Sequence, residues 1–183
     1  MKYITNRLII PHNRLSHCYT AGKIMERIAI LNGEDEDTIH RYFLIGYLHD
    51  SCYDFEDNNE GFVHSDIVSQ ALNYLPYEYN DALKNHTKLK QNNDNLILDY
   101  LYIADALAGG DGYITTLEDR VFELTSRYGK ESKFVLEQKK INNYLIEKGY
   151  FELIDKLINY FVLILCDFLR HHCIHKVNNL RLD

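Results

Sequence analysis

Histidine and aspartate side chains recur along the first 105 residues, and two of them, His49 and Asp50, are adjacent at the end of the apolar segment YLHD. Imidazole nitrogens and carboxylate oxygens suit divalent Fe, Mn, Zn or Co better than a soft thiolate site does. A single His-Asp pair is weak evidence, because so short a motif often arises by chance. A metal site therefore requires further donors from other segments.

The faces on which these residues lie indicate that the donors converge. Residues three, four and seven apart share one stripe of a helix. His17 shares its stripe with Ala21 and Ile24, and Asp105 shares its stripe with Leu101. The same test places six polar side chains on inward-facing stripes, namely His17, His49, Asp50, His64, His86 and Asp105.

Burial of ionised carboxylates needs compensation. An unpaired carboxylate in a protein interior costs several kcal/mol or more, so Asp50 and Asp105 need a cationic partner. A divalent cation can supply that compensation. The alternative is that each histidine is an ordinary satisfied core residue, and for any one of them taken alone this alternative is favoured. The inward placement of the whole set favours a metal site.

The elements that must position these residues are helices. Two prolines in 183 residues and the absence of long strict alternation predict an all-α chain. Polar segments such as NGEDED, KQNNDN and AGGDG separate the predicted helices. These are expected over about 14–31, 37–50, 62–75, 77–89, 94–109, 116–128, 132–148 and 150–173.

Composition limits the class of protein. A chain of 183 residues with 46% hydrophobic residues is expected to form a single domain, 1–183. The formal charge of −7 argues against a binder of nucleic acid polymers. Four cysteines without a CxxC pair favour reduced thiols and a cytoplasmic location. The apolar segment LINYFVLILCDFL is interrupted by Asn159 and Asp167, so we expect a buried helix of a soluble protein and no membrane association.

The order of the motifs resembles the HD-domain superfamily of metal-dependent phosphohydrolases. The matching residues are His17 in RLSH, His49 and Asp50 in LHD, and Asp105 in IAD, with His64 in VHSD and His86 in NHTK as the extra histidines of two-metal members. The resemblance implies an HD-domain helical bundle with additional C-terminal helices. Its metal-binding core would cover about residues 10–110, and the helical extension about 114–175.

The resemblance also implies roles for these residues. Asp50 would bridge two metals, with His17, His49 and Asp105 completing one site and His64 and His86 serving the other. His49 and Asp50 would be the catalytic pair, and a mononuclear site without His64 and His86 stays open. The ion would be Fe, Mn, Zn, Co or Mg.

Within the superfamily the chain is most similar to the bacterial symmetrical diadenosine tetraphosphate hydrolases, through Arg14, Thr87 and Ala104 beside the metal ligands. It departs from HD proteins in having Tyr53 where a lysine is common, and ADALAGGDGY lacks the proline and basic residue that usually follow. The resemblance implies hydrolysis of a phosphoester or phosphoanhydride bond of a nucleotide, such as a dinucleoside polyphosphate. The alternative is a metal- or nucleotide-binding regulatory module with little turnover.

Cationic side chains near the motifs are candidates for phosphate binding. Arg14 stands one turn before His17, Lys88 follows His86 by two residues, and Arg120 is a more distant candidate. The RHHCIHK segment is interpreted as a solvated helix end. We expect the helices after residue 114 to cover the bundle, to shape the substrate pocket or to form a homodimer surface.

Overall fold

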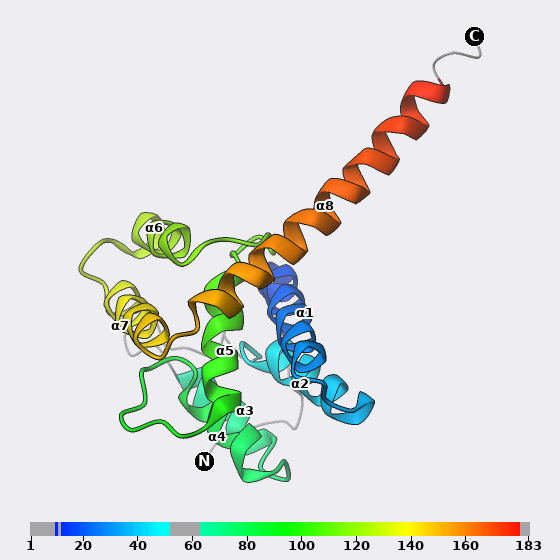
Figure 1. The fold of residues 1–183 in the computed structure, drawn as a ribbon. Helices are drawn as coiled ribbons and strands as arrows, with labels where there is room; N and C mark the ends of the chain where they lie inside the picture. Colours follow the sequence, from blue (N-terminus) through cyan, green and yellow to red (C-terminus); the bar gives the residue numbers. More distant parts are fainter. Residues whose placement is uncertain (1–9, 11, 52–62, 180–183) are drawn as a thin grey trace.

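The computed structural model describes residues 10, 12–51 and 63–179, without the side chains of residues 13, 63 and 167–179. This part of the chain is all-helical, apart from an isolated bridge between Ala108 and Ile114 (Figure 1). A 3₁₀ turn, His12–Arg14, is followed by α1 (Leu15–Leu31), α2 (Glu36–Leu48), α3 (Val63–Ala71), α4 (Tyr77–Asn85), α5 (Leu96–Leu107), α6 (Leu117–Tyr128), α7 (Lys133–Glu147) and α8 (Phe151–Asn179). The all-α prediction is confirmed.

Polar side chains begin several of these helices where the sequence predicts a start. The carboxylate of Asp35 accepts a hydrogen bond from the Thr38 backbone N–H at 2.8 Å at the start of α2. Asn95, Thr116 and Ser132 cap α5, α6 and α7 in the same way. Such caps satisfy backbone N–H groups that have no partner within the helix.

The ends of the helices differ from the predicted bounds in one way that affects the site. Helices α2 and α4 end at Leu48 and Asn85, so His49 and His86 lie directly after their last helical residues. The predicted ranges 37–50 and 77–89 had placed both histidines within helices. The periodicity of the sequence extends across a helix end, and so it does not mark the residue at which the helix stops.

A close approach of α1 and α2 brings the N-terminal ligand candidates together. Gly46 permits it, because a Cβ atom at this position would lie 2.6 Å from the backbone oxygen of Ala21. On α1, Gly22 faces the ring and backbone of Phe43 in the same way. The two helices pack along much of their lengths, so His17 and His49 lie side by side.

Helix α5 is the centre of the bundle. It contacts α1, α2 and α4 on one side and α6 and α7 on the other (Figure 1). Its carboxylate Asp99 is buried and accepts hydrogen bonds from the hydroxyls of Tyr144 and Tyr150, both at 2.8 Å, and from the Asn93 amide at 2.6 Å. These bonds fasten α7 and the start of α8 to the helix that carries Asp105.

Helix α8 differs from the sequence prediction. The segment LINYFVLILCDFL was expected to be buried, but α8 extends away from the bundle (Figure 1), and Val162, Leu163, Ile164 and Leu165 are 47–66% exposed. Among the described side chains of α8, those of its first part pack on the body, where the Arg27 guanidinium lies 4.0 Å from the ring centre of Tyr160. The prediction holds for Leu157, which is fully buried, and was wrong for Val162 to Leu165, because apolar composition does not show whether neighbouring elements reach a segment. No helix in the described ranges is both long and apolar enough to cross a membrane.

Candidate metal centre

Two of the candidate ligands stand at the carboxyl ends of helices, where backbone carbonyls lack helical partners. His49 follows α2, and its Nδ1 lies 2.6 Å from the Gly46 carbonyl oxygen. His86 follows α4, and its Nδ1 lies 2.8 Å from the Leu83 carbonyl oxygen. Each ring thus binds the carbonyl three residues earlier, and this contact directs its Nε2 toward the centre of the bundle.

His17 is oriented by a distant segment. Its Nδ1 lies 3.0 Å from the carbonyl oxygen of Ala108, just after α5. A carbonyl only accepts hydrogen bonds, so in His17, His49 and His86 the Nδ1 atom carries the proton. In a neutral ring the inward Nε2 then presents a lone pair. This arrangement is the one that metal-binding histidines adopt.

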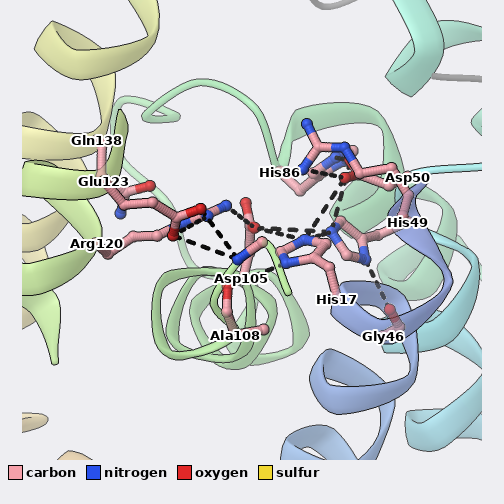
Figure 2. A network of polar contacts seen from close by, with 12 residues as sticks. His17, Gly46, His49, Asp50, His86, Asp105, Ala108, Arg120, Glu123 and Gln138 are labelled. Atoms are coloured by element: carbon pink, nitrogen blue, oxygen red, sulfur yellow. Dashed lines mark hydrogen bonds and ion pairs between the residues drawn. The ribbon is translucent and has the colours of Figure 1, made fainter. Parts of the chain in front are cut away.

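These nitrogens converge with two carboxylates (Figure 2). The Nε2 atoms of His17 and His49 are 3.2 Å apart, as are those of His64 and His86. Asp50 Oδ1 lies 3.2 Å from His64 Nε2, and Asp105 Oδ1 lies 3.2 Å from His17 Nε2. Lone pairs at such distances repel one another unless a proton or a cation lies between them.

Electrostatics favours the ionised carboxylates. Burial alone would raise the pKa of Asp50, but the charges of His49 and Arg14 and the contacts with the rings of His64 and His86 hold this pKa well below its ordinary value. Burial would also raise the pKa of Asp105, but the contacts with His17 and His49 lower it well below the ordinary value. Both aspartates are therefore anionic at neutral pH.

The histidines divide into two kinds. Burial lowers the pKa of His17 and of His86, and it outweighs the opposing effects of Asp105 and Asp50. Burial also acts to lower the pKa of His49, but the Asp50 charge and the contact with Asp105 raise it above its ordinary value. Neutral imidazoles and ionised carboxylates are the protonation states that bind metals.

The arrangement could hold metal ions. His17, His49 and Asp105 form one three-donor group, and His49, Asp50 and His86 form a second that shares His49. In each group the ligand atoms lie within 4.8 Å of one another. His64 adjoins the second group through its contacts with Asp50 and His86. Nitrogen and oxygen donors of this kind fit Fe, Mn, Zn or Co.

A cavity of about 70 Å³ adjoins the cluster. Arg14 and Arg120 lie on its wall and are 8% and 3% exposed. Arg14 Nη1 lies 3.5 Å from Asp50 Oδ2, and Arg120 Nη2 lies 3.5 Å from Asp105 Oδ1. Each carboxylate of the cluster thus has a buried arginine beside it.

Arg120 is held by a second carboxylate as well. Its Nη1 donates to Glu123 Oε2 at 3.0 Å (Figure 2). Glu123 also accepts from the Gly110 backbone N–H at 3.1 Å. The Nε of Arg120 is buried and hydrogen-bonds to no group in the described part of the chain. The guanidinium is therefore fixed in place with one donor that is not satisfied.

The structure brings all six ligand candidates from the sequence together, and five of them are nearly or fully buried. Arg14 also lies at the cluster. Lys88 is exposed and is not among the residues that line the cavity, so its contact with substrate stays a prediction. Tyr53 lies outside the described residues.

Sequence reasoning missed most of one wall of the cavity. Helices α6 and α7 contribute Arg120, Leu124, Tyr128, Phe134, Glu137, Gln138 and Ile141 to it. Of these, only Arg120 was a candidate, because the others have the spacing of ordinary amphipathic helices. Helices α6 and α7 meet the expectation that helices after residue 114 cover the bundle, whereas most of α8 extends away from it.

In comparisons with protein families, curated proteins and solved structures, nothing matches this chain.

Proposed function

We propose that the protein is an HD-type metal-dependent phosphohydrolase that cleaves a phosphoester or phosphoanhydride bond of a nucleotide, with a dinucleoside polyphosphate as one candidate substrate. The observation that supports this proposal most directly is the convergence of inward Nε2 atoms on Asp50 and Asp105, with Nδ1 of three rings bound to backbone carbonyls. Imidazole nitrogens and carboxylate oxygens arranged in this way are suited to binding metal ions and contribute little to a hydrophobic core.

Bound at this cluster, one or two divalent ions would polarise a phosphoryl oxygen and lower the pKa of a water molecule. His17, His49 and Asp105 would hold one ion, and Asp50, His86 and His64 would hold the other. The rings are pre-oriented by their Nδ1 bonds, so little rearrangement accompanies metal binding.

The two arginines would bind the substrate directly through protein side chains, without a metal ion. Arg14 and Arg120 approach the cavity beside different carboxylates, so an anionic phosphoryl group in it would lie between two cations. A guanidinium on the cavity wall can donate charged hydrogen bonds to a phosphoryl oxygen. Donors that are fixed before the reaction stabilise developing charge with little reorganisation.

The volume of the cavity agrees with this use. A cavity of about 70 Å³ leaves room for a small anionic group beside the two arginines.

The test combines metal analysis with an activity screen. The purified protein is loaded separately with Mn²⁺, Co²⁺, Fe²⁺, Zn²⁺ and Mg²⁺ and assayed for phosphate release from nucleoside mono-, di- and triphosphates and dinucleoside polyphosphates. We expect turnover with at least one ion and none after chelation. Bound metal without turnover on any substrate would instead support a regulatory module, and absence of metal binding would exclude both.

A further inference from the structure

The cavity beside the metal cluster extends from Asp50 and Asp105 to side chains of α6 and α7. If the proposed function is correct, a phosphoryl group lies at the cluster and the rest of the substrate lies against the α6 and α7 side chains. These side chains then determine which substrates are accepted.

An aromatic pair belongs to the wall that α6 and α7 contribute. Tyr128 is the last residue of α6, and Phe134 is the second residue of α7. Their ring centres are 4.7 Å apart, with an angle of 36° between the planes. Tyr128 is 39% exposed and Phe134 is partly exposed, so both rings reach from the cavity wall to the surface.

The position of this pair relative to the cations is informative. Arg120 and Tyr128 are on the same helix, two turns apart, and both line the cavity. A ligand whose phosphoryl group contacts Arg120 would extend along α6 toward the aromatic pair. Flat aromatic surfaces bind nucleobases of any sequence, because every base has a π face.

We infer that the Tyr128–Phe134 pair is a nucleoside site, which binds the base of the substrate while the phosphoryl group lies between Arg14 and Arg120. This inference rests on the proposed function and adds to it the place and chemistry of substrate recognition. Helices α6 and α7 would then select the substrate, and the cluster on α1 to α5 would carry out the reaction.

A packing role alone is the competing explanation, since the pair also joins the end of α6 to the start of α7. Binding measurements separate the two roles. Adenosine 5′-monophosphate and ribose 5-phosphate differ only in the base, and inorganic phosphate lacks both base and sugar. Titration calorimetry with each of the three ligands, on the protein loaded with an ion from the activity screen that supports no hydrolysis of them, therefore measures the contribution of the base at equilibrium.

We expect the wild type to bind the nucleotide at least about 5-fold more tightly than ribose 5-phosphate, as stacking of one base provides. Phe134→Ala should remove that difference and leave the affinity for inorganic phosphate unchanged. Phe134→Leu keeps an apolar side chain for packing but lacks the ring, and should behave in the same way. Phe122→Ala is the matched control, because Phe122 is 73% exposed on α6 and lies outside this cavity.

The possible results distinguish a nucleoside site from a packing role. Equal affinity of the wild type for the nucleotide and ribose 5-phosphate, with phosphate still bound, would overturn the nucleoside site and leave the phosphohydrolase proposal intact. A preference for the nucleotide that survives both Phe134 variants would also overturn it. Failure of the metal-loaded wild type to bind phosphate, together with no turnover, would refute the proposed function itself.

Discussion

Replacement of Asp50 by Asn is the most direct test of the metal centre. The carboxylate contacts five cationic or imidazole groups, with Oδ1 3.2–3.7 Å from His64, His49 and His86 and Oδ2 3.5 Å from His17 and from Arg14. Asn preserves the volume and removes the charge. We expect Asp50→Asn to lose metal binding and hydrolysis together.

The size of the effect follows from binding linkage. A metal at about 100 times its Kd stabilises the folded wild type by about 2.7 kcal/mol. For a chain of this length, about 2–4 °C per kcal/mol gives a rise in Tm of about 5–11 °C. If the substitution weakens binding about 100-fold, the same metal concentration stabilises the variant by only about 0.4 kcal/mol, a rise of about 1–2 °C.

The assay compares Tm with and without Co²⁺ within each variant, so the loss of the Arg14–Asp50 contact in the metal-free protein does not enter the comparison. Metal content after dialysis and the visible absorption of bound Co²⁺ give independent readings. Asp155→Asn is the matched control, because this aspartate is exposed on α8 and contacts only Asn159 among the groups that the structure records. A rise in Tm and a Co²⁺ spectrum in Asp50→Asn equal to those of the wild type would refute the proposed ligand set.

Three further predictions concern the cations, the helix packing and the acid response. Arg120→Met should retain bound metal but weaken phosphate binding about 10-fold or more, because a charged hydrogen-bond donor is lost; Lys88→Ala in the same calorimetric assay should also retain metal, with the smaller loss expected of an exposed cation. Gly46→Ala should lower the free energy of unfolding by about 1–3 kcal/mol in urea denaturation, because the new methyl group clashes with the α1 backbone. An unchanged free energy of unfolding would contradict this prediction and show that α1 and α2 can move apart at no cost. Burial raises the pKa of Glu123, but the charge and hydrogen bond of Arg120 outweigh it and hold this pKa below its ordinary value of 4.5. Its stabilising contribution is thus complete above about pH 4.5 and is lost as the pH falls through the lower folded value. Glu123→Gln should show a shallower fall in Tm than the wild type between about pH 6 and about pH 3, and parallel curves would contradict this.

Much of the helical fold could be predicted from the sequence because helix formation is governed by neighbours three and four residues apart. The apolar stripes of α1 and α5 identify the inward faces that carry His17 and Asp105. Caps such as Asp35 and Thr116 mark helix starts by their side-chain chemistry. The ligand candidates were therefore accessible to sequence reasoning as a set of residue types on inward faces.

Contacts between distant segments were not accessible in this way. The proton on His17 Nδ1 is assigned by the carbonyl of Ala108, 91 residues further along the chain. Tyr128 and Phe134 have no motif that distinguishes them from other amphipathic helix residues, and they reach the cavity only because α6 and α7 pack against α5.

Helix α8 also shows that contacts between distant segments could not be predicted from the sequence. The sequence by itself determined that residues 157–169 prefer an apolar environment, since that preference is a property of the side chains. Only the tertiary structure decided that Val162 to Leu165 lie on an exposed part of the helix. The physical reason is that burial depends on which elements pack around a segment, and for both α8 and the cavity wall those elements are distant in sequence.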